Sequence, residues 1–389
     1  MFEPPHPLSS FRRAAWATAT VLAMGAGAAP GGPAVSAQDP PSQGIDGAIP
    51  APAPPLRIGL DRPVLGMGIN AHHIGNLSLY LKAVDAIADL GANTLLVVTP
   101  MFQERVDSSR IQFRPQKCPT DGQLKAILRR GRIRGLQTIL LPIVLIEVPG
   151  PKDWRGVINP SDLDAWWASY ALFINHFLDI AIDAEVDVLS VGSELNSMEG
   201  ELQRWRRTID HARSRFDGYI TYSANWDRYQ RVTFWSWLDF ISVSAYFELA
   251  RDEPDAPVDK LAAAWRRERR TLLEHARRYD RSILLMEIGY PSVPWAAAHP
   301  WNYVADAQTA ADHEAQARCY RAFFEAWAET VARPGSRALG FNCYFWDPYH
   351  SGGPDDTGYG VHGKPAERVI AASFARIRKT VGEQKDSPK

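Results

Sequence analysis

The sequence predicts an α/β fold of the (β/α)₈ barrel class (TIM barrel), built as one large domain. Eight short apolar runs recur along the chain, helix-like segments separate most of them, and 46% of the 389 residues are hydrophobic. Near-continuous apolar strands that alternate with helices are typical of a parallel sheet covered by helices. Because there are eight of them, a closed barrel is favoured over an open, doubly wound sheet.

The eight predicted strands share a short apolar core bounded by polar or turn residues. In order they are VLGMGIN (64–70), NTLLVVT (93–99), QTILLPIVL (137–145), VDVLSVG (186–192), GYITYSA (218–224), DFISVSAY (239–246), SILLMEIG (282–289) and ALGFNCYF (338–345). No G-x-G-x-x-G or G-x-x-x-x-G-K-[ST] motif follows the first strand. The usual nucleotide-binding interpretation is therefore excluded.

Three of the intervening segments predict helices with recognisable ends. LSLYLKAVDAIADLG (77–91) places Gly91 at the C-cap. SDLDAWWASYALFINHFLDIAI (161–182) offers Ser161 as the N-cap. DHEAQARCYRAFFEAWAETVA (312–332) has apolar residues near helical spacing.

The N-terminus predicts a targeting segment. Arg12 and Arg13 precede the apolar stretch AAWATATVLAMGAGAA, and AVSA at 34–37 offers a cleavage point. We therefore assign 1–37 to a signal peptide, 38–58 to a Pro-rich linker, 59–380 to the barrel domain and 381–389 to a polar tail. This predicts a periplasmic or secreted protein with no stable membrane span after processing; an uncleaved anchor or a disordered tail are the alternatives.

Charge and cysteine content exclude several classes of protein. A formal net charge of −1 gives no electrostatic footprint for nucleic acid or an anionic membrane. Cys118, Cys319 and Cys343 lack C-x-x-C spacing, so neither a disulfide framework nor a zinc knuckle is indicated. The 13 Trp, 13 Tyr and 15 Phe suit sugar faces and a Trp-rich core equally well.

Polar and aromatic residues stand where the predicted strands end, the place where barrel enzymes collect their function. They are Asn70, His72 and His73 after the first strand, Glu194 after the fourth, Asn225 and Trp226 after the fifth, Tyr246 after the sixth, Glu287 in the seventh, and Trp346 and Asp347 after the eighth. An unpaired buried glutamate is costly. We therefore expect Glu194 and Glu287 to meet across the barrel mouth.

Paired carboxylates flanked by aromatic rings are what glycosidic cleavage requires. One carboxyl group gives a proton to the leaving oxygen, while the other attacks the anomeric carbon or activates water against it. A neighbouring negative charge makes the second ionisation harder, so the pair shares one proton. The alternative is two unrelated polar strand ends, one of them bridged to an arginine.

The motifs SVGSELNS, LLMEIGYPS, YFWDPY and GYGVHGKPA resemble those of clan A retaining glycoside hydrolases, most closely glycoside hydrolase family 113, the endo-β-1,4-mannanase-like group. The likeness spans roughly residues 60–375. It implies that Glu194 is the general acid/base and Glu287 the nucleophile in a double displacement that needs no cofactor. It also implies that Trp346 is the platform under the sugar, that Tyr246 is a hydrogen-bond partner of the nucleophile, and that the substrate is a β-linked glycan of the β-1,4-mannan type.

One position departs from the clan. Many members have Asn directly before the acid/base, where it contacts the sugar 2-hydroxyl, but this chain has Ser193. A hydroxyl is shorter and has one donor, so the contact is lost, water-bridged or supplied by another residue such as Asn225.

The remaining candidates support the same interpretation less directly. Adjacent strand residues point opposite ways, so His72 and His73 do not suit one metal ion, and a sugar hydroxyl is the better ligand for one of them. Trp154, Trp295 and Trp301 could wall a groove or cap the core, and the loop HSGGPDDTGYG (350–360) favours a solvated connection. A non-catalytic carbohydrate-binding barrel and a cell-envelope structural protein remain as rival functions.

Overall fold

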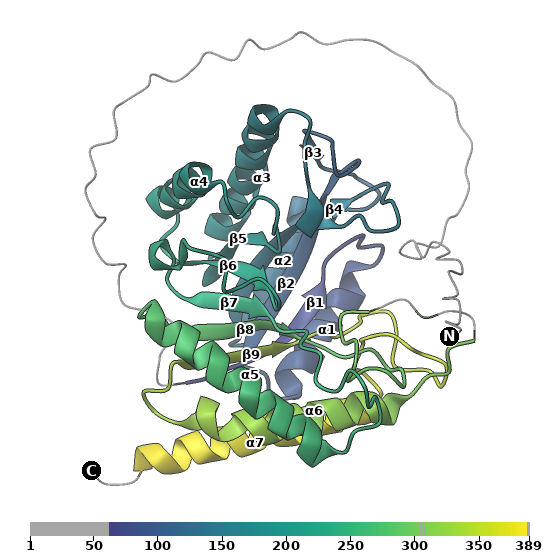
Figure 1. The fold of residues 1–389 in the computed structure, drawn as a ribbon. Coiled ribbons are helices and arrows are strands. Elements are labelled where there is room, and N and C mark those ends of the chain that lie inside the picture. Colours follow the sequence, from purple (N-terminus) through teal and green to yellow (C-terminus); the bar gives the residue numbers. More distant parts are fainter. Residues whose placement is uncertain (1–61, 303–304, 306–307, 387–389) are drawn as a thin grey trace, which may run out of the picture. The chain divides into compact units, whose positions relative to one another are not determined.

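The computed structural model describes residues 62–302, 305 and 308–386 and confirms the barrel (Figure 1). Eight parallel strands close on themselves because β1 pairs with both β2 and β9. The strands are β1 (Val64–Asn70), β2 (Thr94–Gln103), β4 (Gln137–Ile146), β5 (Val188–Ser193), β6 (Tyr219–Asn225), β7 (Ile241–Ser244), β8 (Ile283–Ile288) and β9 (Ala338–Cys343). A two-residue strand, β3 (Ile111–Gln112), pairs antiparallel with the end of β2.

Helices cover the outside of this barrel. They are α1 (Leu77–Asp89), α2 (Asp121–Ile133), α3 (Leu163–Asp183), α4 (Leu202–Arg215), α5 (Val258–Arg278), α6 (His313–Ala332) and α7 (Pro365–Asp386). Two 3₁₀ helices, η1 (Arg155–Val157) and η2 (Trp235–Trp237), lie in the β4–α3 and β6–β7 connections. Helices α5, α6 and α7 lie side by side (Figure 1).

The helix ends agree with the sequence at some positions and correct it at others. Gly91 follows α1 with φ +97°, as a C-terminal glycine should. The N-cap of α3 is Asp162 and not Ser161, because the Asp162 carboxylate accepts the N–H of Ala165 at 2.9 Å. The predicted polar tail at 381–389 overlaps the end of α7, which continues to Asp386.

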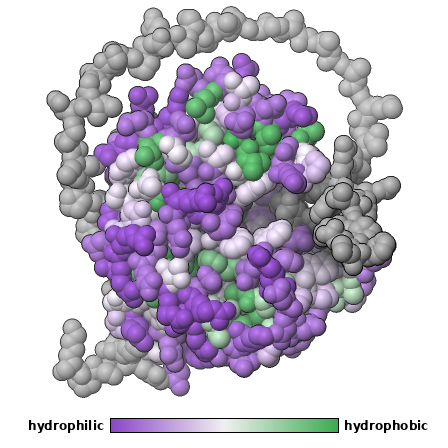
Figure 2. All heavy atoms as spheres, in the orientation of Figure 1, coloured by the Kyte–Doolittle hydropathy of each residue, from purple (hydrophilic) through white to green (hydrophobic). Residues whose placement is uncertain are grey.

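The predicted signal peptide and linker (1–37 and 38–58) lie outside the described residues. Within the part of the chain that the structure describes, no helix is long and apolar enough to cross a membrane. The face seen in Figure 2 is mostly hydrophilic, with small separate apolar patches. That face therefore has no broad apolar surface of the kind that marks a large docking site.

The core has two apolar layers, one inside the barrel and one between the sheet and the helices. Many of the aromatic rings serve this second layer: five tryptophans are fully buried, namely Trp166, Trp205, Trp235, Trp265 and Trp327. The three cysteines are buried and unbridged. Burial raises the pKa of Cys319 to about 12, so this thiol is chemically inert at neutral pH.

The loop at 350–360 is fixed by a buried lysine. The Lys364 ammonium is fully buried and donates to Ser292 Oγ and to the Gly358 carbonyl, each at 2.9 Å. It also lies 3.1 Å from a carboxylate oxygen of Asp356. The loop is thus tied to the barrel at this point, while residues 350–358 are exposed or half-buried, as its composition favours.

Replacing Lys364 with methionine is expected to lower the free energy of unfolding by about 2 kcal/mol, because it removes charged hydrogen bonds and leaves Ser292 buried without its donor. Urea unfolding of Lys364→Met measures this loss. The matched control is Lys82→Met, which removes an exposed ammonium. Equal free energies of unfolding for the two variants would contradict the role of Lys364 in holding the loop.

Candidate active site

Glu194 follows β5 in a backbone conformation that few side chains adopt. Its φ is +54°, in the left-handed region. Two hydrogen bonds hold this turn: the Glu194 N–H donates to the Ser223 carbonyl at 2.8 Å, and the Leu195 N–H donates to Tyr222 Oη at 2.8 Å. Strain of this kind persists only where the surroundings enforce it, and here it directs a carboxylate at a strand end.

The glycine that precedes this turn is required by packing. A Cβ on Gly192 would lie 2.8 Å from Tyr170 Oη and 3.0 Å from both the Trp205 and the Tyr222 ring. Only glycine lets the strand approach these three buried rings closely. The glycine thus allows the bulged end of β5 to pack where Glu194 begins its turn.

Glu287 lies on β8, and a chain of contacts inside the barrel leads to it from β5. Ser193 is the register partner of Ser223, whose hydroxyl is hydrogen-bonded to that of Ser244 at 3.0 Å. Ser244 is in turn the register partner of Glu287. The contacts run across β5, β6, β7 and β8, so the two glutamates belong to one rim of the barrel.

The two carboxylates interact electrostatically. Burial, and after it the negative charge of Glu194, raises the pKa of Glu287 to about 7. The Tyr246 hydroxyl, which donates to Glu287 Oε2 at 2.7 Å, and the Arg155 charge act in the opposite direction. Glu287 therefore carries a proton below about pH 7. The hydrogen bond from Tyr246 is the one that the family resemblance implies.

Arg155 is the residue of this site that sequence reasoning missed. It begins η1 in the β4–α3 connection, and its Nη2 lies 2.5 Å from Glu194 Oε2. Its charge also reaches Glu287. The sequence left a bridging arginine open as the alternative to a catalytic pair. In the structure the Arg155 guanidinium forms an ion pair with Glu194, and its charge also acts on Glu287. Only its place between Trp154 and Gly156 in a loop rich in turn residues could have pointed to it.

Three further side chains surround the pair. Tyr344, two residues before Trp346, accepts a hydrogen bond from Asn70 Nδ2 at 2.8 Å. Burial and the charge of Glu287 raise the pKa of Tyr344, so its hydroxyl keeps its proton. Burial and the Arg155 charge lower the pKa of His72 to about 4, so its imidazole is neutral. In the described residues no group of three His, Cys, Asp or Glu side chains could hold a metal ion.

Several buried polar atoms at this rim have no hydrogen-bond partner within the described residues. They include Asn70 Oδ1, Ser193 Oγ and Arg155 Nε. Buried polar atoms without partners are unfavourable unless a ligand satisfies them. Together they offer acceptors and donors of the kind that hydroxyl groups bind. A substrate contact of Ser193 in place of the clan's asparagine stays a prediction.

Other predicted site residues are engaged elsewhere. The Asn225 amide closes its own turn, since its Nδ2 donates to Asp227 at 2.9 Å and its Oδ1 accepts the Trp226 N–H at 3.1 Å. Trp226 packs edge-on against Phe247. The structure thus gives no support to Asn225 as the substitute for the missing asparagine.

The predicted aromatic platforms differ in their exposure. Trp346 is only 3% exposed, and its ring stacks on His362 with centroids 4.3 Å apart. Its role as a platform stays a prediction. Trp154 packs over Gly156, whereas Trp301 is 46% exposed and donates to Glu248 at 3.0 Å. Trp295 is half-buried.

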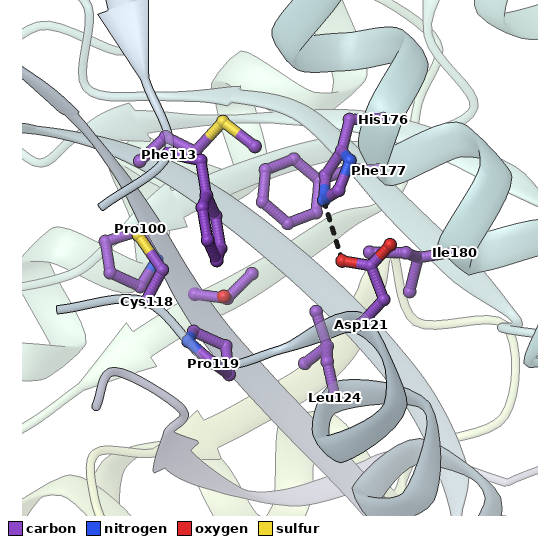
Figure 3. Close-up of a pocket in the computed structure, with 11 residues that line it drawn as sticks. Pro100, Phe113, Cys118, Pro119, Asp121, Leu124, His176, Phe177 and Ile180 are labelled. Atoms are coloured by element: carbon purple, nitrogen blue, oxygen red, sulfur yellow. Dashed lines mark ion pairs between the residues drawn. The ribbon is translucent and has the colours of Figure 1, made fainter. Parts of the chain in front are cut away.

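A separate small pocket shares no lining residue with this site (Figure 3). It lies where β2 meets the starts of α2 and the middle of α3. An ion pair between His176 Nε2 and Asp121 Oδ1, 3.3 Å apart, lies beside it, and most other walls are apolar. None of the predicted catalytic residues faces it.

A (β/α)₈ barrel with two interacting buried glutamates at one rim is the arrangement expected of a glycosidase. A family model described as Glycoside Hydrolase Family 113 matches residues 80–364, more than half of the chain. The chain therefore belongs to Glycoside Hydrolase Family 113.

Solved structures agree with this assignment. The GH113 β-mannanase AaManA from Alicyclobacillus acidocaldarius, in complex with ManMIm, is 26% identical with a TM-score of 0.71, over 81% of this chain and 98% of that one. A GH113 β-1,4-mannanase is 24% identical with a TM-score of 0.70, over 81% and 99%. A β-glucuronidase from Faecalibacterium prausnitzii, 13% identical with a TM-score of 0.53 over 81% and 49%, shares the fold. A search of curated protein sequences found no match.

Proposed function

We propose that this glycosidase cleaves a β-linked glycan of the β-1,4-mannan type by a retaining double displacement. The observation that carries the proposal is the electrostatic coupling of Glu194 and Glu287, with Tyr246 donating to Glu287 and Arg155 bound to Glu194. Glu287 attacks the anomeric carbon while Glu194 protonates the departing oxygen. Glu194 then acts as a base on the water that hydrolyses the glycosyl-enzyme.

Mannan is the preferred substrate class because the chain belongs to family 113 and a 26% identical family member is named a β-mannanase. The unpartnered polar atoms of Asn70, Ser193 and Arg155 suit a neutral, hydroxyl-rich ligand. The decisive experiment is product analysis after incubation with mannan, glucomannan, cellulose and xylan. We expect oligosaccharides from mannan and glucomannan. Binding without any cleavage would instead favour the non-catalytic barrel.

The stereochemical outcome tests the mechanism independently of the substrate class. Double displacement releases the product first as the β-anomer, because two inversions restore the original configuration. Proton NMR of early products from a mannooligosaccharide measures this directly. Initial release of the α-anomer would contradict the nucleophilic role of Glu287.

Removing the Tyr246 hydroxyl is expected to shift the pH dependence of activity. Its hydrogen bond lowers the pKa of Glu287, so Tyr246→Phe raises that pKa above its value of about 7. The active pair carries one proton, and above the pKa of Glu287 it carries none, so the alkaline limb of the kcat/KM profile should move up by roughly one pH unit. The control is Tyr279→Phe, at the residue that follows α5. A uniform loss of rate with an unmoved alkaline limb would contradict this role.

We also propose export, supported by Arg12 and Arg13 before an apolar stretch and by AVSA at 34–37. Expression in a bacterial host followed by fractionation and N-terminal sequencing tests it. We expect a mature chain that starts after Ala37 in the periplasm or medium. Full-length chain retained in the cytoplasm would contradict it.

A further inference from the structure

The contact between Arg155 and Glu194 is at odds with the task of an acid catalyst. A general acid must carry a proton, whereas a guanidinium 2.5 Å from Glu194 Oε2 stabilises the ionised form. Glu194 is 6% exposed, so solvent screens this attraction only weakly. Among the described residues Glu287 has no such ion pair, and the neutral Tyr246 hydroxyl is its hydrogen-bond partner.

Hydrogen bonds to the backbone of η1 position Arg155 beside Glu194. The Ser197 N–H donates to the Gly156 carbonyl at 3.1 Å, and Ser197 Oγ donates to the Ile158 carbonyl at 2.6 Å. These bonds tie η1 to the loop that leaves Glu194. The Trp154 ring packs against Gly156. Arg155 is therefore anchored at its backbone.

We propose that Arg155 is a positioning residue that keeps Glu194 ionised in the substrate-free enzyme and releases it when a glycan binds, so that the single proton of the pair passes from Glu287 to Glu194. The inference rests on the proposed function. The transfer is balanced: Glu287 loses a proton and becomes the anion, Glu194 gains it, and the net charge is unchanged. The Arg155 charge interacts with Glu287 as well as with Glu194, so the cation stabilises whichever of the two carboxylates is ionised.

Several charged and titratable groups surround the pair. Glu194 is influenced by Arg155 on η1 and Glu287 on β8, and it acts on Glu199 in the β5–α4 loop and on Tyr344 after β9. Glu287 additionally contacts Tyr246, and Arg155 acts on His72. Arg155 is the positive charge within this set.

The test compares pH profiles of kcat/KM for the wild type, Arg155→Gln and Arg155→Lys with a mannooligosaccharide. Loss of the cation makes both ionisations of the pair harder, so both limbs of the Arg155→Gln profile should move up by about one pH unit. Arg155→Lys should restore most of the shift. Arg105→Gln, a 60% exposed side chain on the β2–β3 connection, is the control and should leave the profile unchanged. A lower kcat/KM in Arg155→Gln with both limbs at their wild-type pH values would overturn the proposal.

A second readout needs no substrate. Carbon NMR titration of labelled glutamate carboxyls is done in a Glu199→Gln background, because burial raises the pKa of Glu199 to about 7 as well. We expect the remaining resonance that titrates near pH 7 to vanish in Glu287→Gln. Its loss in Glu194→Gln instead would overturn the proposal. If the alkaline limb persists in Glu194→Gln, then the assignment of the acid, and so the proposed function, has failed rather than the role of Arg155.

Discussion

Replacing Glu287 with alanine is expected to lower kcat by roughly 10⁴-fold or more, because it removes the proposed nucleophile. The measurement is initial rate on a mannooligosaccharide and on a dinitrophenyl β-mannoside. The good leaving group should not rescue the variant, since a glycosyl-enzyme cannot form without the Glu287 carboxylate.

Azide supplies the independent check on Glu287→Ala. The truncated side chain leaves space for this small anion on the face of the sugar opposite the leaving group. Azide should restore part of the rate with the dinitrophenyl substrate and yield the α-mannosyl azide by a single inversion. Near-wild-type turnover of Glu287→Ala without azide would contradict the assignment of Glu287 as the nucleophile.

Loss of activity in Glu287→Ala should not reflect loss of folding. The folded protein raises the pKa of Glu287 from 4.5 to about 7, so the ionised carboxylate is less stable in the folded state than in the unfolded chain. The native state thus binds more protons between these values, and this group's contribution to stability falls as the pH rises through that window. At pH 8 we expect Glu287→Ala to melt no lower than the wild type, with Glu274→Ala on exposed α5 as the control.

The barrel and the pair of glutamates at its rim were predictable for the same physical reason. Strands buried on both faces must be almost wholly apolar, so their ends are visible in the sequence. Parallel strands bring their C-terminal ends to one rim, which placed Glu194 and Glu287 together without any knowledge of distances. Tyr246 followed from its position after β7.

The rest depended on contacts between distant segments. Arg155 reaches Glu194 because Ser197 and Trp154 fix η1, and no local pattern in a turn-rich loop reveals this. A strand end also does not determine where a side chain points. Asn225 turns back onto its own loop, and Trp346 is covered by His362, although both follow strands as predicted.

The capping residue of α3 shows the same limit at short range. Ser161 and Asp162 are both good N-caps, and the choice depends on which oxygen reaches the N–H of the third helical residue. Asp162 does so, while the Ser161 N–H donates to the Asp107 carbonyl and so belongs to the preceding loop. The predicted N-cap is therefore wrong by one residue, and this error does not affect the candidate active site.

Replacing Glu194 with alanine is expected to separate substrates by their leaving groups. Cleavage of mannooligosaccharides needs proton donation and should fall by roughly 10³-fold, the scale of general acid catalysis. A dinitrophenolate departs without a proton, so the first step with dinitrophenyl β-mannoside should remain within about tenfold of the wild type. The measurements are the steady-state rate on mannooligosaccharide and the pre-steady-state rate on the aryl substrate.

The second step of the Glu194→Ala reaction should then become limiting, because no base activates the water. A rapid burst of dinitrophenolate followed by slow turnover is the expected trace. Azide needs no base, so it should speed turnover and give the β-mannosyl azide by two inversions, the opposite anomer from Glu287→Ala. Equal losses on both substrates, or the α-azide from both variants, would show that Glu194 is not the acid/base.

Arg155 complicates Glu194→Ala in a way that can be measured. The truncation leaves the guanidinium without its carboxylate partner, and Glu287 is then the remaining carboxylate of the pair on which this buried cation acts. The acid limb of the first step should lie below about pH 7, because Glu287 has lost the neighbouring negative charge and keeps a nearby cation. In the double variant Arg155→Gln with Glu194→Ala this limb should lie at higher pH than in Glu194→Ala, because the cation is gone, while the burst persists. Because the burst reports the missing base and the difference between the two limbs reports the unpaired cation, the two variants separate the chemistry of Glu194 from the charge that Arg155 contributes.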